Sequence, residues 1–209
     1  MSPALPARGR DQNSSPAEDA PVPRPGTGRR LAWLLALWAF AYACYRAYYA
    51  VGGTVGMIGE PVSDVEFRTI NAVGAAIIFV AAVLPPVAVR VPRLRRALPA
   101  LGWLTAVGCC THALVNITLR IFSLTGVHPT VLPADVWRWY DRHGSDLQDL
   151  LLNEPWFLAE GLLWAALGLM FVAAPRRRAW VLSAAVACLA LTVVGVLSGL
   201  DVIGSFRIG

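Results

Sequence analysis

Six polar side chains that lie within or beside long apolar stretches are the residues of this sequence best suited to chemistry. They are Arg46, Asn71, His112, Asn116, Arg120 and Glu160. An ionisable side chain costs roughly 2.5–3.5 kcal/mol at the centre of a membrane helix, so each one requires a partner or a ligand. Arginine with amide groups is suited to binding an anion, whereas histidine with a carboxylate is suited to acid–base catalysis.

The spacing of these residues predicts that they meet. His112, Asn116 and Arg120 follow one another at intervals of four, so on a helix they share one face. At 1.5 Å per residue, Arg46 lies about 22 Å along its apolar stretch and Glu160 about 6 Å into its own, which places both in the outer third of a membrane. Two other stretches carry polar residues at their outer ends, Asn71 and Asp201. The sequence therefore predicts a polar pocket that opens outward.

These residues are compatible with three functions. The leading hypothesis is that all six bind a small amphiphilic or anionic ligand, such as a lipid headgroup. The second is an intramembrane enzyme in which His112 and Glu160 act as acid and base, but no nucleophile motif or phosphate-binding loop accompanies them. The third is a structural or accessory subunit, in which Arg46 pairs with Glu160 and the polar layer only locks helices together.

No pattern in the sequence indicates a metal or a cofactor. His112 is the only histidine in an apolar stretch, and His128 and His143 do not have the spacing of metal ligands. Cys109 and Cys110 are adjacent instead of forming a C-x-x-C pair, which favours apolar packing over redox chemistry.

Five apolar stretches of 19 to 23 residues must position these groups: 31–51, 69–89, 97–119, 156–174 and 179–200. Each is long enough to cross a hydrocarbon core of about 30 Å as a helix. Helices are expected because the backbone N–H and C=O groups of a segment in lipid must form their hydrogen bonds within that segment. The sequence predicts an all-α integral membrane bundle of five transmembrane helices, residues 29–209, preceded by a disordered tail, residues 1–28.

The arginines predict the orientation of this bundle. All 18 basic residues are arginine, and twelve fall in three clusters at 8–30, 90–96 and 176–178. Cytoplasmic loops carry the positive charge of membrane proteins, so the N-terminus is predicted inside and the C-terminus outside the plasma membrane. The net charge of +5 is then explained by the arginines of the cytoplasmic segments, and no nucleic acid partner is expected. A cleaved signal ending at Ala39-Phe40-Ala41 remains an alternative, although the apolar character continues beyond it.

The remaining segments suggest a cap and a packing motif. In the long external segment 120–155, short helices are expected at Pro133–Arg142 and Asp146–Asn153. Ser145 to Gln148 would form a capping box for the second helix, and Pro155 would end it. Gly195 and Gly199 form a GxxxG pattern, which would join helices within the bundle or join two copies as a homo-oligomer.

Residues 45–53, Tyr-Arg-Ala-Tyr-Tyr-Ala-Val-Gly-Gly, resemble the end of the first helix in a family of small bacterial multi-spanning membrane proteins of uncharacterised activity. The family motif there is His-x-Tyr-Trp-Ala-x-Gly-Gly, so Arg46 stands in place of His and Tyr49 in place of Trp. Residues 153–157, followed by Gly161, are similar to the family's Pro-Trp entry into its penultimate helix. The resemblance implies a multi-spanning architecture and an important outer end of the first helix, and it implies no activity.

Overall fold

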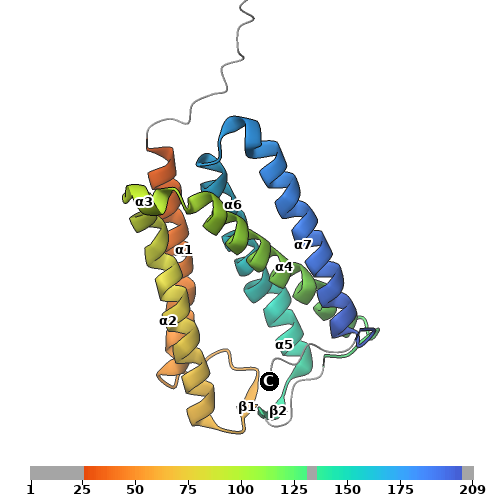
Figure 1. The fold of residues 1–209 in the computed structure, drawn as a ribbon. Coiled ribbons are helices and arrows are strands. Elements are labelled where there is room, and N and C mark those ends of the chain that lie inside the picture. The colour runs from red at the N-terminus through yellow and green to blue at the C-terminus, as the bar shows by residue number, and fades with distance from the viewer. Residues whose placement is uncertain (1–25, 131–135, 204–209) are drawn as a thin grey trace, which may run out of the picture.

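The computed structural model describes residues 26–130 and 136–203, which are mainly helical (Figure 1). The long helices are α1 (Thr27–Ala50), α2 (Asp64–Ala88), α4 (Leu98–Leu124), α6 (Glu154–Met170) and α7 (Arg177–Gly199). The shorter elements are β1 (Gly59–Pro61), α3 (Pro92–Arg95), β2 (Trp137–Tyr140), α5 (Arg142–Gln148), the π-helical turn η1 (Asp149–Asn153) and the 3-10 turn η2 (Ala174–Arg176). Most of the predicted disordered tail, residues 1–25, lies outside the described residues, and α1 already begins at Thr27.

Each of the five apolar stretches predicted from the sequence coincides with one long helix, so the all-α fold class is confirmed. Three helices are long and apolar enough to cross a membrane by length and composition: α2, α4, and α7 together with η2. α6 has 17 residues, and α1 has a lower mean hydropathy because Arg46 and several tyrosines interrupt it. The protein is thus a helical bundle with three candidate membrane spans.

The arginine clusters within the described residues gather at one end of the bundle. Arg29 and Arg30 lie in the first turn of α1, α3 follows α2, and residues 176–178 lie where α7 begins. Because successive long helices run in opposite directions, these segments all lie at the top of Figure 1. We call this the arginine end. The opposite end, formed by residues 51–63, 125–130 and 136–153, is the capped end.

The outward faces of the long helices are apolar. No residue of α7 is buried, although it carries Leu182, Val186 and Leu189, each more than half exposed. α2 likewise exposes Ile77 and Val80. Soluble monomers rarely expose apolar patches of this extent, whereas helices surrounded by lipid do so along their whole length.

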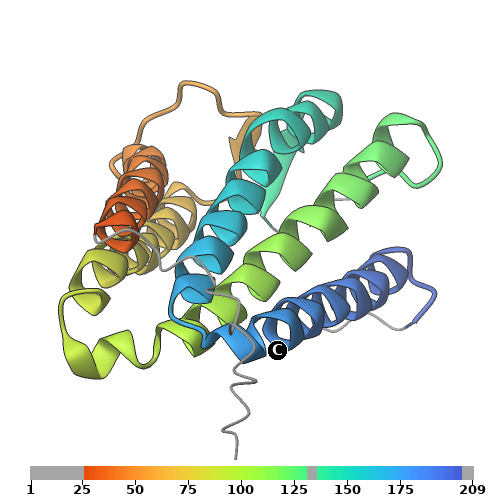
Figure 2. The same ribbon diagram turned by 90° about the horizontal axis from the view of Figure 1, so that it is seen from above.

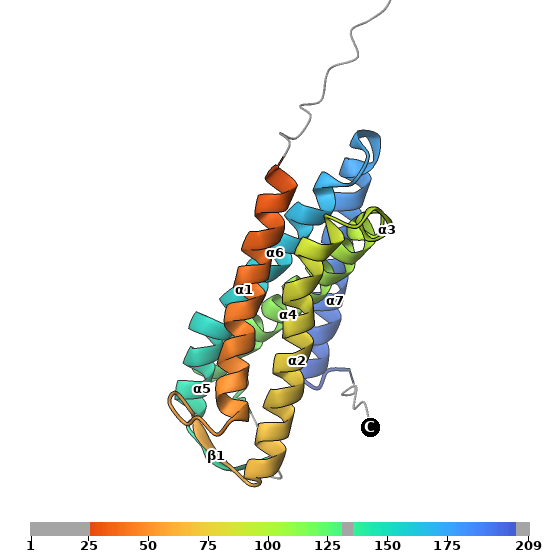
Figure 3. The same cartoon turned by 90° about the vertical axis from the view of Figure 1, so that its left-hand side faces the viewer.

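The long helices form two units that meet along α6. α1 and α2 pack side by side (Figure 3), and α4 packs against both α6 and α7. Small residues let α4 and α6 approach closely, since a Cβ atom on Gly102 would lie 2.7 Å from Cα of Gly168. Membrane helices associate through such contacts because the hydrophobic effect does not drive them together in lipid.

The GxxxG pattern of α7 faces α4. A Cβ atom on Gly195 would lie 2.6 Å from Cγ2 of Val115, and one on Gly199 would lie 2.6 Å from Cδ1 of Leu119. These glycines therefore pack within the bundle, which is one of the two uses that the sequence left open. A homo-oligomer through Gly195 and Gly199 stays a prediction.

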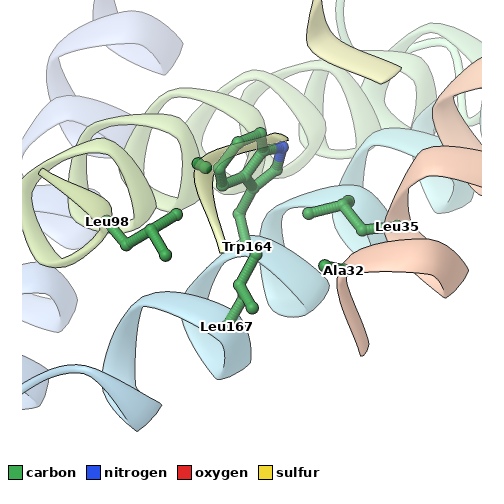
Figure 4. Close-up of a cluster of buried hydrophobic side chains, with 6 residues drawn as sticks. Ala32, Leu35, Leu98, Trp164 and Leu167 are labelled. Carbon is green, nitrogen blue, oxygen red and sulfur yellow. The ribbon is translucent and has the colours of Figure 1, made fainter. Parts of the chain in front are cut away.

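A core of buried side chains joins the two units near the arginine end. Its labelled members are Ala32 and Leu35 of α1, Leu98 of α4, and Trp164 and Leu167 of α6 (Figure 4). Further along, Trp38 of α1 stacks on Trp156 of α6 with ring centroids 4.1 Å apart. By contrast, α2 and α4 scarcely touch, and they diverge toward the capped end (Figures 1 and 2). The two units are therefore packed together near the arginine end, whereas α2 and α4 lie apart toward the capped end.

The helix predicted at Pro133–Arg142 is wrong. Residues 133–135 lie outside the described residues, and Trp137–Tyr140 forms strand β2, which pairs antiparallel with β1. The pairing requires glycine at position 59, because a Cβ atom there would lie 2.5 Å from the carbonyl oxygen of Trp139. Short strands are specified by such cross-strand contacts, which a local helical pattern does not reveal.

The second short helix exists but begins earlier and does not end at Pro155. Asp141 caps α5, since its carboxylate accepts a hydrogen bond of 3.1 Å from the amide of Gly144. The chain then stays helical from α5 through the π-helical turn η1 into α6. Pro155 lies in the first turn of α6, where its missing N–H and fixed φ disturb a helix least. A wide turn in a continuous helix thus replaces the predicted break.

The motif at the end of α1 has a steric explanation. Gly52 has a φ of +93°, which glycine adopts without strain after a helix. The hydroxyl of Tyr48 accepts hydrogen bonds from the amides of Thr54 and Val55, at 3.1 and 2.9 Å. This folds the Tyr48 ring against Gly53, where a Cβ atom would collide with it. The Tyr-x-x-x-Gly-Gly spacing therefore builds the turn that leads into β1.

Candidate functional site

Two neighbouring cavities lie at the open side of the bundle, toward the capped end. The larger has a volume of about 450 Å³. α1 and α2 line it with Tyr42, Arg46, Gly74, Ile77 and Ile78, and α4, η1 and α6 line it with His112, Asn116, Arg120, Asp149, Asn153, Glu154 and Phe157. Four of the six residues selected from the sequence thus surround one cavity: Arg46, His112, Asn116 and Arg120.

The smaller cavity, of about 230 Å³, adjoins the first on the side of the capped end. The two cavities share Arg46, Arg120, Asp149 and Asn153. The remaining lining of the smaller cavity is rich in aromatic rings and amides, and it includes Tyr45, Tyr49, Phe67, Asn71, Trp137 and Gln148. Asn71 therefore faces the same site as Arg46, through the second cavity.

Arg46 stands at the junction of the two cavities. Its side chain is partly buried, and it forms no hydrogen bond or ion pair with residues 26–130 or 136–203. Gly74 of α2 makes room for it, since a Cβ atom there would lie 3.3 Å from Nε of Arg46. The ion pair with Glu160 considered from the sequence is not formed. A guanidinium in this position has donors left for a carboxylate or phosphate.

Arg120, in contrast, is held by two carboxylates. Its Nη2 lies 2.8 Å from Oδ2 of Asp149, and its Nη1 lies 3.4 Å from Oδ1 of Asp146. Nη1 also donates to the hydroxyl of Thr130 at 2.9 Å. Asp146 is only 1% exposed, and Ser123 of α4 donates to its other oxygen. These bonds fix α5 and η1 onto the end of α4, so Arg120 has fewer donors left for a ligand than Arg46.

His112 and Asn116 interact with each other, as their spacing predicts. Nδ2 of Asn116 lies 3.0 Å from the carbonyl oxygen of His112 and 3.2 Å from its Nε2. The nearest carboxylate to the imidazole is that of Glu154, at 3.7 Å, and not that of Glu160. The histidine–carboxylate pair of this site is therefore His112 with Glu154.

Glu154 lies just before the apolar stretch 156–174, at the wall of the larger cavity. Burial raises the pKa of Glu154 to about 7, and the charge of Asp149 adds to this rise while Arg120 opposes it. A large share of Glu154 is therefore uncharged at neutral pH. This reduces the negative charge that the cavity wall presents to a ligand near Arg46.

Two polar residues expected in the pocket lie elsewhere. Glu160 is 5% exposed and lines neither cavity, because its side chain is close to the indole of Trp164 one helical turn further along α6. Asp201 is exposed in the turn after α7 and lines neither of these cavities; it lines a third one, which shares Asn116 and Arg120 with the larger cavity. For these two residues the sequence did not predict the direction in which the side chain points.

Sequence reasoning missed four residues of the larger cavity that carry polar groups: Tyr42, Asp149, Asn153 and Glu154. A usable signal was present in the short helix of the capped end. Asp146, Asp149 and Asn153 lie at intervals of three and four, which places them on one face of a helix. On the other faces, Leu151 and Leu152 are exposed. Within the described residues, no group of three or more His, Cys, Asp or Glu side chains is arranged to hold a metal ion.

Comparisons with protein-family models, with curated proteins and with solved structures found no match to this chain. The resemblance of residues 45–53 to a family of bacterial membrane proteins therefore stays a prediction.

Proposed function

We propose that this protein binds the anionic headgroup of a small amphiphile at Arg46, in a cavity that opens between α2 and α4. The observation that carries the proposal is the guanidinium of Arg46, which has no partner among the residues that the structure describes and lies at the junction of two cavities. A buried or half-buried charge without a partner is costly, and a bound anion would offset that cost. The polar groups of His112 and Asn116 lie across the cavity and supply further hydrogen bonds.

The opening of the larger cavity suits an amphiphile better than a soluble anion. Ile77 of α2 is 65% exposed and lines this cavity, and the side chain of His112 on α4 is 51% exposed. α2 and α4 are both candidate membrane spans. A hydrocarbon chain can therefore leave between them into lipid while the headgroup remains at Arg46. Pockets that combine an apolar wall with a few convergent polar groups are typical of ligand sites.

The proposal includes the finer topology: five membrane helices in the plasma membrane, with the N-terminus cytoplasmic and the C-terminus external. The arginine clusters at one end of the bundle support it, because positive charge is retained on the cytoplasmic side. α1 has 24 residues, about 36 Å of helix, which also suffices to cross a bilayer. The cavities would then face the outer leaflet.

Single-cysteine labelling tests this topology. In a variant whose four native cysteines are replaced by Ala, Val55→Cys at the capped end should react with a membrane-impermeant maleimide in intact spheroplasts. Leu94→Cys at the arginine end should react only after the membrane is permeabilised, because α3 lies in the cytoplasm. The opposite pattern would reverse the orientation, and labelling of both positions without permeabilisation would contradict a five-span arrangement.

Substitution of Arg46 tests the binding function. Arg46→Gln should weaken binding of a short-chain phosphatidic acid to the protein in phosphatidylcholine nanodiscs by about 10–100-fold, since a charge-assisted bond is worth roughly 1.5–3 kcal/mol. Isothermal titration calorimetry measures the change. The matched control is Arg68→Gln, which removes an exposed arginine at the same end that lines neither cavity; it should bind as the unaltered protein does.

Equal affinity in Arg46→Gln and Arg68→Gln would contradict the proposal. Loss of thermal stability in Arg46→Gln without any measurable ligand would instead favour the accessory-subunit hypothesis. An intramembrane enzyme would require turnover that is lost in His112→Ala, and the carboxylate that lies near His112 is that of Glu154.

A further inference from the structure

We infer that the anionic group bound at Arg46 carries a hydroxyl-bearing substituent, as the phosphate of phosphatidylglycerol does, and that this substituent occupies the smaller cavity. The inference rests on the proposed function and specifies its ligand. Its basis is a pair of asparagines in the lining of the smaller cavity, whose amide oxygens are buried and have no hydrogen-bond donor within the described residues. They are Asn71 of α2 and Asn153 of η1.

The orientation of the Asn71 amide is determined by its own helix. Its Nδ2 donates to the carbonyl oxygen of Phe67 at 2.8 Å, and only a nitrogen can make that bond. Oδ1 is therefore left without a donor, in a residue that is 2% exposed. An unpaired buried acceptor is destabilising, because it has lost its hydrogen bond to water without gaining another. A donor within the cavity would offset that cost.

Asn153 repeats this arrangement on the opposite wall. Its Nδ2 donates to Oδ1 of Asp149 at 2.7 Å, which again determines the orientation and leaves Oδ1 buried without a donor. Asn153 lines both cavities, as Arg46 does. The site therefore presents an unpaired cation at the junction and two unpaired neutral acceptors on the side of the smaller cavity.

Neutral acceptors match hydroxyl groups better than an ammonium group. An ammonium would prefer a carboxylate, but the carboxylate of the smaller cavity, Asp149, is already bonded to Arg120 and Asn153. The other amide of this wall, Gln148, directs its Nε2 at the carbonyl oxygen of Gly56, at 3.1 Å. A volume of about 230 Å³ exceeds the share of one water, about 30 Å³, several-fold, so a group of glycerol size fits.

The test compares dioctanoyl lipids that differ only in the headgroup, titrated onto the full chain in phosphatidylcholine nanodiscs. Phosphatidylglycerol should bind at least about tenfold more tightly than phosphatidic acid or phosphatidylethanolamine, because it alone carries alcohol hydroxyls on a substituent of the phosphate. Asn71→Leu should lower phosphatidylglycerol affinity by a larger factor than phosphatidic acid affinity, so that the preference between the two lipids is lost. Thr69→Leu, an exposed change on the same helix that lines neither cavity, should alter neither.

Each of the other possible results would refute either the inference about the hydroxyl group or the proposed function. Equal affinities for phosphatidylglycerol and phosphatidic acid, both lost in Arg46→Gln, would refute the hydroxyl inference and leave the proposed function standing. Tightest binding of phosphatidylethanolamine would assign an ammonium instead. Affinities that do not depend on Arg46 would refute both. If Asn71→Leu does not fold, Asn153→Leu tests the same preference from the opposite wall.

Discussion

Arg120→Met is expected to lower the free energy of unfolding by about 3–5 kcal/mol, the cost of removing one partner from a buried charge cluster. Asp146 is 1% exposed, and the side chain of Asp149 is 20% exposed. Without the guanidinium, both carboxylates would remain in the contact between α4 and the capped end with no cation to balance them. Thermal unfolding in detergent, followed by the fluorescence of the eight tryptophans, should show a melting temperature lower by on the order of 10 °C.

A second arginine provides a matched control. Arg138 pairs with Glu60 across the two-stranded sheet, but their side chains are 62% and 48% exposed. Exposed pairs contribute about 0–1 kcal/mol, so Arg138→Met should shift the melting temperature by only a few degrees. Adding Asp146→Asn to Arg120→Met should restore part of the loss, because it removes the unpaired buried charge. Equal shifts in the two single arginine variants would show that Arg120 does not anchor the cap.

Gly102→Leu is expected to have the second largest effect, because it forces two helix backbones apart. A Cβ atom at this position would lie 2.7 Å from Cα of Gly168 and 2.8 Å from the carbonyl oxygen of Trp164. These are backbone atoms, which cannot rotate away as a side chain can. We expect a destabilisation of at least about 3 kcal/mol, measured by the same thermal unfolding, since overpacking a close contact costs roughly 1–3 kcal/mol even for small groups.

Gly108 of the same helix is the control for this substitution. It is exposed, and a Cβ atom there would have no atom within 4 Å. Gly108→Leu should therefore leave stability unchanged or raise it slightly, because leucine has the higher helix propensity. If both leucine variants unfold at the same temperature, the close approach of α4 and α6 would not be a source of stability.

The helices were predictable because their signal is local. A run of about 20 apolar residues selects a helix in lipid wherever it occurs in a fold, so each apolar stretch of the sequence coincides with a helix. The segment 137–140 was not predictable in this way. Its aromatic and charged residues fit an interfacial helix, and only pairing with Gly59–Pro61, far away in the sequence, makes it a strand.

The directions of the site side chains were only partly predictable. Interval spacing placed His112, Asn116 and Arg120 on one face of α4, and the structure brings all three to the larger cavity with Arg46. Glu160 was expected with them, but α6 is rotated so that Glu154 faces the cavity instead. The apolar stretch of α6 has the same residues whichever way the helix is turned about its axis. Its sequence therefore does not reveal which side chains face the cavity.

The sequence by itself determined the helical class, the limits of the long helices to within a few residues, and the position of the arginine clusters at one end. Each of these follows from the composition or the periodicity of consecutive residues. Only the tertiary structure decided that Arg46 has no partner in the described part of the chain, that Asp146 and Asp149 neutralise Arg120, and that Asn71 and Asn153 line one cavity. These facts depend on how helices distant in the chain rotate and diverge, and packing at Gly102–Gly168 and in the core around Trp164 determines that geometry.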